Sequence, residues 1–299
     1  MASGAEKMLV YWSGGKPNIG DEVNPWLWPR IAPARLTLDD SVEFFGIGSI
    51  LTGSNLSRTT KPKIIFGSGK RDASPIDKDI IARCEIDFVR GPLTAISLGL
   101  TESAAITDPA ALMPLVYQPE KVVPVPSRIG FVPHLSMPQS QAQAIAAALD
   151  LFLILPSFAV EKFIDALLSC TAVVTEAMHG AILADSYRIP WMGCSFSSFL
   201  SEGKTNAFKW NDWMLSMSIQ TGRSKALHFP LGNWNPRIGR AINSVMTRTY
   251  ISALRRQISE GRWALSADEK LKIKQDQLLE RVERLRQKNS EFINQPPGS

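Results

Sequence analysis

The chain has 299 residues, of which 44% are hydrophobic and 20% charged, and its formal net charge is +5. These are the values of an ordinary globular protein, and the length favours two domains over a single core. The positive charge lies in residues 237–299, which hold 13 Lys and Arg against 7 Asp and Glu, whereas the rest of the chain holds 20 and 21. Because no recognised motif accompanies this charge, we expect no nucleic-acid binding.

Neither a signal peptide nor a membrane span is expected. The apolar run at 8–12 is too short for a signal sequence, and the longest apolar stretch, 145–160, is interrupted by an aspartate and a proline. The three cysteines are widely spaced and form no CxxC pair, which argues against a zinc site or a disulfide framework. They are Cys84, Cys170 and Cys194. We therefore expect a cytoplasmic protein without a metal ion.

Short apolar runs followed by glycine or a polar turn predict strands in the first half of the chain. They lie at 8–12, 42–48, 63–69, 86–90 and 105–108. A helix is predicted from Pro92 to Leu98, with proline in its first turn. Strands that alternate with helices indicate a parallel sheet covered on both faces.

A second series follows the proline-rich stretch 119–126, a predicted linker. The predicted strands are 128–134, 151–155, 171–175 and 191–196, and the predicted helices are 138–149, 157–169 and 180–188. The chain is thus predicted to be α/β, with one domain at 8–118 and another at 127–236.

Residues 237–290 predict a helical C-terminal extension. Its last helix has an apolar stripe opposite Lys and Arg, formed by Leu271, Ile273, Leu278, Leu279, Val282 and Leu285. Two interpretations are open, and we favour the first. The helix packs on the body or on a second subunit, or its basic face lies on an anionic membrane surface.

The glycine-rich segments fit no nucleotide-binding motif. The GSGK segment at 67–70 lacks the earlier glycine and the Ser or Thr of a phosphate loop, and GIGS at 46–49 lacks the third glycine of a dinucleotide fingerprint. Both are better explained as glycine turns at strand ends, where backbone N–H groups can approach a ligand.

The segment at 18–30 places polar groups directly after the first strand. Asn18, Asp21, Glu22 and Asn24 precede two tryptophans. Neighbouring carboxylates at a sheet edge can share a proton, which suits acid–base work. The alternative is helix capping, with Asp21 or Asn24 opening a helix and Pro25 in its first position.

Other candidates also follow predicted strands. Arg90 could hold a carboxylate or phosphate, or form only a surface ion pair. Asp108 precedes Pro109 and is expected to cap a helix whatever else it does. His134 follows a strand. Lys209 and Trp210 lie in KWNDW, which is either a sugar-stacking surface or simple packing.

His179 lies in the turn Glu176–His179, between a buried strand and a helix. In an open α/β sheet that turn is at the carboxyl edge, where ligands bind, and a helix N-terminus attracts anions. The alternative is a histidine that caps the turn by bonding to backbone.

Taken in order, these segments resemble the polysaccharide pyruvyltransferase family, in particular its ketal-forming bacterial exopolysaccharide branch. They are NxGDExNPW, the GSG turn, VRGPLTA, ITDPA, GFVPH, EAMHGAILAD followed by YRIPW, and KWNDW. The resemblance covers about residues 10–215. It implies two Rossmann-like domains in a GT-B-like arrangement, with phosphoenolpyruvate as donor and a sugar diol, usually on a lipid-linked oligosaccharide, as acceptor.

The resemblance places His179 at the donor, for phosphate binding or proton transfer. Arg90 is expected to hold the donor, and Asp21 or Glu22 to deprotonate the acceptor, with no cofactor required. Some relatives carry an arginine where this chain has Ala177, so another cation must replace it. Its candidates are Arg90, Arg128 and Lys209.

Two other functions stay open at this point, a glycosyltransferase that uses a nucleotide sugar and a non-catalytic partner in a polysaccharide assembly complex. Peripheral association with the inner face of the membrane and a homo-oligomer formed through the C-terminal helices are further expectations. We also expect His179→Ala and Arg90→Ala to lose transfer and keep the fold.

Overall fold

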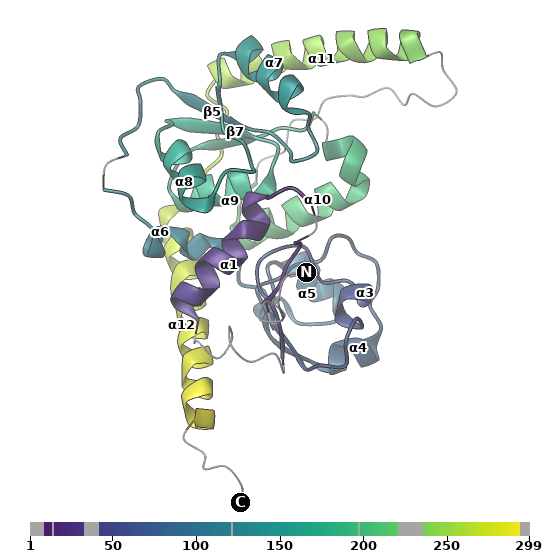
Figure 1. Cartoon of the computed structure of the whole chain (residues 1–299), viewed down its shortest axis with the longest axis vertical. Coiled ribbons are helices and arrows are strands. Elements are labelled where there is room, and N and C mark those ends of the chain that lie inside the picture. Colours follow the sequence, from purple (N-terminus) through teal and green to yellow (C-terminus); the bar gives the residue numbers. More distant parts are fainter. Residues whose placement is uncertain are drawn as a thin grey trace, which may run out of the picture. The chain divides into compact units, whose positions relative to one another are not determined.

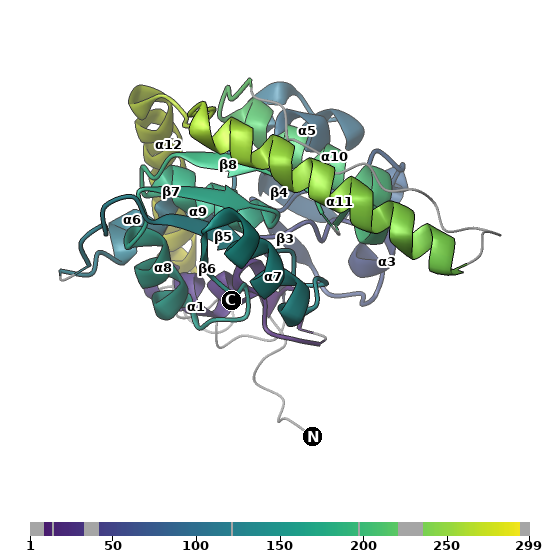
Figure 2. The ribbon, with the colours of Figure 1, turned by 90° about the horizontal axis from the view of Figure 1, so that it is seen from above.

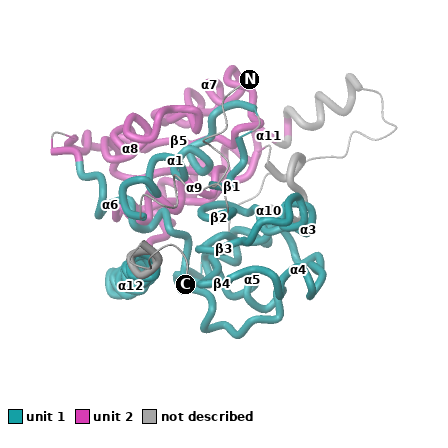
Figure 3. Tube along the Cα trace, turned by 60° about the horizontal axis from the view of Figure 1, so that its bottom comes forward, with its two compact units in different colours: residues 1–118, 204–220, 266–299 teal, residues 119–203, 221–265 magenta. Residues whose placement is uncertain are grey.

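A computed structural model of the chain describes residues 9–13, 15–32, 42–120, 122–196, 198–220 and 236–293. The chain forms two compact units (Figure 3). Unit 1 consists of residues 1–118, 204–220 and 266–299, and unit 2 of residues 119–203 and 221–265. Each unit is therefore built from separated segments, whereas the sequence analysis expects three consecutive ones. His228 has no supporting motif in the sequence, which favours a structural role, and it lies outside the described residues.

Unit 1 contains a four-stranded, all-parallel sheet with the strand order β1-β2-β3-β4. The strands are β1 (Leu9–Val10), β2 (Glu43–Phe45), β3 (Lys63–Phe66) and β4 (Cys84–Phe88). Its helices are α1 (Ile19–Ile31), α3 (Gly53–Leu56), α4 (Lys78–Ala82), α5 (Pro92–Ser97) and α6 (Met113–Val116). Two 3₁₀ helices are η1 (Glu102–Ala104) and η2 (Pro109–Leu112).

The predicted strand at 105–108 is wrong. Ala105 forms only an isolated bridge to Val89, and 3₁₀ helices occupy both sides of the segment. The side chain of Asp108 caps η2 by accepting a hydrogen bond from Ala110 N–H at 3.0 Å, which confirms its predicted capping role.

Aromatic rings fill one face of the unit 1 sheet. Trp28 of α1 packs edge-on against Phe44 and Phe66, with ring centroids 5.1 and 5.6 Å apart, and Phe66 packs against Phe88 at 4.7 Å. On the opposite face, alternate residues such as Phe45 enter a second buried cluster. The sheet is thus covered on both faces, as the sequence predicts.

Unit 2 contains a second all-parallel sheet, with the strand order β6-β5-β7-β8. Its strands are β5 (Ile129–Val132), β6 (Phe152–Leu153), β7 (Ala172–Thr175) and β8 (Trp191–Gly193). Its helices are α7 (Gln139–Leu149), α8 (Val160–Leu168), α9 (Met178–Ser186) and α11 (Pro236–Ser259). Both sheets agree with the predicted α/β class and are compatible with two Rossmann-like domains.

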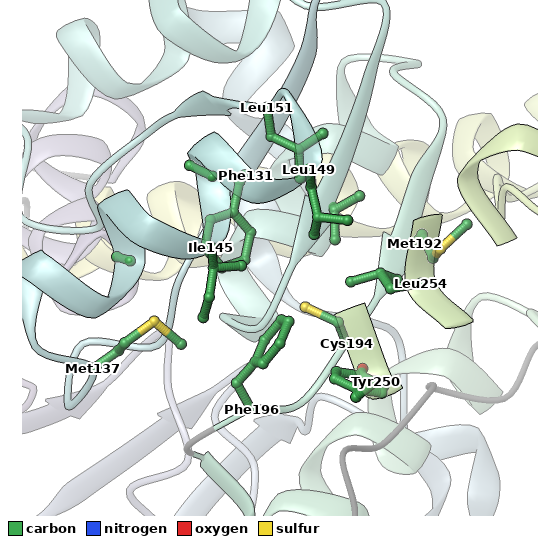
Figure 4. Close-up of a cluster of buried hydrophobic side chains, with 13 residues drawn as sticks. Phe131, Met137, Ile145, Leu149, Leu151, Met192, Cys194, Phe196, Tyr250 and Leu254 are labelled. Carbon is green, nitrogen blue, oxygen red and sulfur yellow. The ribbon is translucent and has the colours of Figure 1, made fainter. Parts of the chain in front are cut away.

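Helices α7 and α11 lie side by side on unit 2 (Figures 1 and 2). The buried cluster in Figure 4 lies between them and the sheet, and combines Phe131 of β5, Ile145 of α7 and Leu254 of α11. The first part of the predicted extension is therefore part of the core of unit 2.

Helix α12 (Asp268–Ile293) belongs to unit 1 and packs on η2. Leu271, Leu278, Val282 and Leu285 of the predicted stripe are buried, whereas Ile273 and Leu279 are exposed. The buried face also contains Gln275, whose Nε2 donates to the carbonyl of Ala111 at 2.9 Å. Packing on the body, the favoured interpretation, is what this helix does. Within the described part of the chain, no helix is both long and apolar enough to span a membrane.

Candidate functional site

The carboxyl edge of the unit 2 sheet is held together by a buried glutamate. Glu176 follows β7 and is 1% exposed. One carboxylate oxygen accepts the N–H of His134, after β5, at 3.2 Å, and the other accepts the N–H of Phe196, after β8, at 2.6 Å. Through these two bonds Glu176 joins the ends of three neighbouring strands.

His179 lies three residues beyond this glutamate. Helix α9 begins at Met178 with Ala177 at its N-cap, and no side chain caps it. His179 is therefore in the first turn of the helix, whereas the sequence predicts it in the turn before the helix. The start of α9 packs closely on β7: a Cβ atom at Gly180 would lie only 2.3 Å from the hydroxyl of Thr175. The partly buried His179 ring is thus placed at the positive end of α9.

His134 lies at the same edge, two residues beyond β5, and its ring is bound to its own loop. The N–H of Ser136 donates to His134 Nδ1 at 3.2 Å, and the Ser136 hydroxyl lies 2.7 Å from the same nitrogen. The carboxyl edge of the unit 2 sheet therefore gathers His134, Glu176 and the first turn of α9; we call this the unit 2 edge.

Arg90 lies in unit 1 and is completely buried. Its Nε donates to Asp212 Oδ2 at 3.1 Å, Nη1 donates to the hydroxyl of Ser49 at 2.6 Å, and Nη2 donates to the carbonyl of Lys70 at 3.1 Å. The predicted alternative of a surface ion pair is wrong, since both partners are fully enclosed. These contacts connect the loops after β2, β3 and β4 to one guanidinium group.

Asp212 comes from helix α10 (Ser198–Ser216) and completes the Arg90 cluster. It accepts the backbone N–H of Thr94 at 2.9 Å and the Thr94 hydroxyl at 2.7 Å, so it caps the N-terminus of α5 from another helix. A Cβ atom at Gly91 would lie 2.1 Å from the Asp212 carbonyl. The close packing of α10 on this segment therefore requires a glycine at position 91.

The KWNDW segment lies on α10 with its two tryptophans inward. Trp210 and Trp213 are 1% and 2% exposed, and their rings meet edge-on with centroids 6.3 Å apart. This burial favours packing over a sugar-stacking surface. Lys209 is partly buried in the same helix.

Asn24 does not cap a helix, contrary to one prediction. Helix α1 begins at Ile19 with Asn18 at its N-cap position, and Pro25 lies inside it. The Asn24 side chain is fully buried and makes four hydrogen bonds, to Asp21 O, to Trp28 Nε1, and to both backbone groups of Ile47. Because Pro25 has no N–H to offer the Asp21 carbonyl, the Asn24 amide replaces it.

Asp21 and Glu22 are partly exposed and lie in the first turn of α1, where the helix dipole interacts favourably with negative charges. Asn18 Nδ2 donates to Asp21 Oδ2 at 2.7 Å. The structure thus brings Asn18, Asp21 and Glu22 together after β1, in unit 1, while His134 and His179 belong to unit 2.

The three cations considered for the missing arginine belong to different parts of the fold. Arg128 precedes β5 and so lies at the opposite, amino edge of the sheet, where its Nη1 donates to Ser169 at 3.2 Å. Arg90 and Lys209 belong to unit 1. Within the described ranges, no three His, Cys, Asp or Glu side chains gather as metal ligands would.

The sequence model of the polysaccharide pyruvyl transferase family matches residues 7–198, which include both β-sheets. The chain belongs to the polysaccharide pyruvyl transferase family. The chain is 32% identical over 210 residues to the succinoglycan biosynthesis protein ExoV of Rhizobium meliloti (strain 1021). The matched region covers 70% of this chain and 64% of ExoV, which is less than two thirds of that relative's length. No solved structure matches the chain.

The polar groups that organise the two sheet edges were not predicted from the sequence. The sequence places Glu176 only in a turn, although a carboxylate directly after a buried strand is a signal for a role at that edge. Asp212 is separated from Arg90 by 122 residues, and no local pattern connects them. Ser49 was visible only as the end of a glycine turn.

Proposed function

We propose that this chain transfers the carbon unit of phosphoenolpyruvate onto two hydroxyl groups of a sugar, forming a pyruvate ketal during exopolysaccharide biosynthesis. Membership in the family supports the transferase class, and similarity to a succinoglycan biosynthesis protein supports the biosynthetic setting. The unit 2 edge carries the proposal, because it places His179 in the first turn of α9 beside the strand ends that Glu176 joins. Open α/β sheets bind ligands at this edge.

The reaction balances without oxidation or reduction. Carbon C3 of phosphoenolpyruvate gains a proton, each sugar hydroxyl forms one C–O bond to C2, and the C2–O bond to phosphate breaks. Of the two protons that leave the hydroxyls, one replaces the proton given to C3 and the other leaves with inorganic phosphate. The chemistry therefore needs acid–base groups and anion-binding groups, and no cofactor enters the proposed mechanism.

We assign the donor to the unit 2 edge, with His179 binding phosphate or transferring the proton to C3. We assign deprotonation of the acceptor to Asp21 or Glu22, with Asn18 and Lys209 as further acceptor contacts. Four residues expected at the site have enclosed side chains with internal roles, and we no longer propose them as ligands. They are Asn24, Arg90, Asp108 and Trp210.

The proposed acceptor is a lipid-linked oligosaccharide, and the proposed location is the cytoplasm at the inner face of the membrane. A GT-B-like arrangement of the two units and a homo-oligomer through the C-terminal helices belong to the same proposal. The acceptor sugar itself is identified by the experiment below.

The test is to incubate the purified chain with isotopically labelled phosphoenolpyruvate and a lipid-linked oligosaccharide extract. We expect the label in the saccharide fraction, together with release of inorganic phosphate in equal amount. His179→Ala should abolish both while leaving the circular dichroism spectrum and melting temperature unchanged. Tight binding of nucleotide sugars without binding of phosphoenolpyruvate would instead support a glycosyltransferase.

A scaffold role makes the opposite prediction for the variants. In that case His179→Ala would keep exopolysaccharide production in cells, and deletion of 250–299 would abolish it. Since Leu254 and α12 pack in the cores of the two units, this deletion must be judged only on protein that is still folded. Point substitutions of the exposed Ile273 and Leu279 are the better probe of a partner surface.

A further inference from the structure

We infer that the outward side of helix α11 binds the head groups of an anionic membrane surface. The partner is a bilayer that contains anionic lipid, and the contact is electrostatic. This inference rests on the proposed function for its purpose, because the proposed acceptor is attached to a lipid. The surface itself is argued from the charge and burial of α11.

The positive charge of unit 2 is concentrated in the last part of its chain. Residues 221–265 contain 8 Lys and Arg against 1 Asp or Glu, whereas residues 119–203, which form the sheet, contain 4 against 7. Helix α11 alone carries five arginines and no acidic residue. A strongly basic helix is thus attached to an acidic α/β core, and a negatively charged surface would orient such a unit with this helix toward it.

Burial divides α11 into two sides. Tyr250 and Leu254 enter the core of unit 2, and Ile251 and Ile258 pack against it, so the helix is fixed along α7 (Figure 2). The exposed positions follow one another at spacings of three or four residues, as one side of a helix does. We call them the outer face of α11: Val245, Arg248, Thr249, Ser252, Arg256 and Ser259.

The cations of this face are only partly neutralised. Arg248 is exposed, and no acidic group of the described ranges forms an ion pair with it. Arg256 and Arg262, which follows the helix, share the single carboxylate of Glu260, each at 2.6 Å. Exposed ion pairs of this kind contribute little energy, so both guanidinium groups can exchange Glu260 for a lipid phosphate.

Helix α12 is similar in length but has a balanced charge. It contains 7 Lys and Arg against 6 Asp and Glu, and exposed cations on it are paired with carboxylates. Three such pairs are Lys272–Asp276, Arg284–Glu280 and Lys288–Glu85. The membrane contact considered for the last helix of the extension is therefore assigned to α11.

A lipid surface fits the outer face better than a nucleic acid does. Val245 is 62% exposed on the same side as the arginines, and an apolar side chain among cations suits the boundary between head groups and acyl chains. The apolar side of α11 is already used by the core, so the helix can lie flat on the surface without inserting deeply. The binding should then depend on anionic lipid and on salt.

The test measures binding of the full chain to vesicles without any substrate. The vesicles contain phosphatidylcholine alone or a mixture with phosphatidylglycerol, at low and high salt. One triple variant removes three charges from the basic side of unit 2, and a matched control removes three from α12. They are Arg248→Gln with Arg256→Gln and Arg262→Gln, and Lys272→Gln with Arg284→Gln and Lys288→Gln. Arg255 is kept, because it donates to the carbonyl of Ala148 at the end of α7.

We expect the wild type to bind the mixed vesicles, to ignore phosphatidylcholine alone and to be released by high salt. An arginine near an anionic surface contributes about fivefold in affinity, so the unit 2 variant should bind about a hundredfold more weakly. The α12 control should stay within about threefold of the wild type. Replacing the same three arginines with lysine keeps the charge and should keep the binding, which shows that the positions tolerate substitution.

Equal losses in the two glutamine variants would overturn the inference, because total charge and not the outer face would then decide binding. Tighter binding to a DNA duplex than to the mixed vesicles would overturn it as well. The outcome is separate from that of the proposed function. If vesicle binding follows the expected order but no pyruvyl transfer occurs, only the proposed function falls; if transfer occurs and vesicle binding does not follow this order, only this inference falls.

Discussion

Replacing Asp212 with leucine should destabilise unit 1 strongly. The carboxylate of Asp212 accepts three hydrogen bonds, from Arg90 Nε at 3.1 Å, Thr94 N–H at 2.9 Å and the Thr94 hydroxyl at 2.7 Å. The ion pair it forms with Arg90 is inaccessible to solvent on both sides. Leucine has the same branching and the same number of side-chain heavy atoms as aspartate, but its bulkier methyl groups carry no charge and accept no hydrogen bonds.

The magnitude follows from what is left behind. Without Asp212, the buried guanidinium of Arg90 keeps only two neutral acceptors, the Ser49 hydroxyl and the Lys70 carbonyl. Removing one partner of a buried ion pair usually costs about 3–5 kcal/mol, whereas replacing both partners with apolar residues is often close to neutral. We therefore expect Asp212→Leu to lower the free energy of unfolding by about 3–5 kcal/mol, and Arg90→Met with Asp212→Leu to cost less than the sum of the two single variants.

The assay combines urea unfolding at pH 7 with hydrogen exchange. The loss of protection should concentrate in α5 and α10, which Asp212 joins, while α7 and α8 of unit 2 serve as the internal control. A single variant that costs less than about 1 kcal/mol, or a double variant that costs the full sum, would refute the reasoning. The same argument corrects an expectation from the sequence, because Arg90→Ala should not keep the fold intact.

Three further predictions concern packing and titration. Gly180→Ala should lower the free energy of unfolding by about 1–3 kcal/mol through overpacking, because the new Cβ would lie 2.3 Å from the Thr175 hydroxyl. Gly53→Ala is the matched control and should be close to neutral, because nothing lies within 4 Å of its Cβ position. Urea unfolding measures both variants. Burial lowers the pKa of Lys70 below 10.5, so the unfolded chain holds this proton more tightly than the folded chain does. The free energy of unfolding should therefore rise with pH between the lowered pKa and 10.5. Melting curves recorded over this pH range should show the rise for the wild type and not for Lys70→Met. Burial also raises the pKa of the Cys84 thiol, so alkylation at pH 8 should be slower than that of an unhindered model thiol and should accelerate as the pH rises past 9; fast labelling at pH 8 would contradict this.

The strands were predictable from the sequence because parallel strands buried on both faces are short apolar runs. β3 and β7 are such runs, and each ends where glycine or a charged residue stops it. Exact helix starts were less predictable. Pro25 suggested a helix that begins at Pro25, with Asn24 at its N-cap. Helix α1 tolerates this proline because the Asn24 side chain bonds the carbonyl that the proline leaves unpaired.

Among the candidate residues, the places of His134 and His179 in unit 2 could be predicted from the sequence. His179 and His134 each follow a strand, so their shared sheet edge follows from the topology of a parallel sheet. Arg90 carries the same local pattern and still has a different environment, because its partner Asp212 arrives from a helix far along the chain. The sequence near Arg90 cannot distinguish an arginine that binds a ligand from one that forms a buried ion pair, because the partner helix lies far along the chain.

The route of the chain has a consequence for how the protein is made. The backbone passes between the two units four times, after residues 118, 203, 220 and 265. Unit 1 therefore cannot complete its packing on the ribosome until α12 has been synthesised, since that helix supplies the side chains that cover η2. Until then, the nascent segment around η2 carries an uncovered apolar surface, and chaperones that bind such surfaces should act on this chain before α12 emerges.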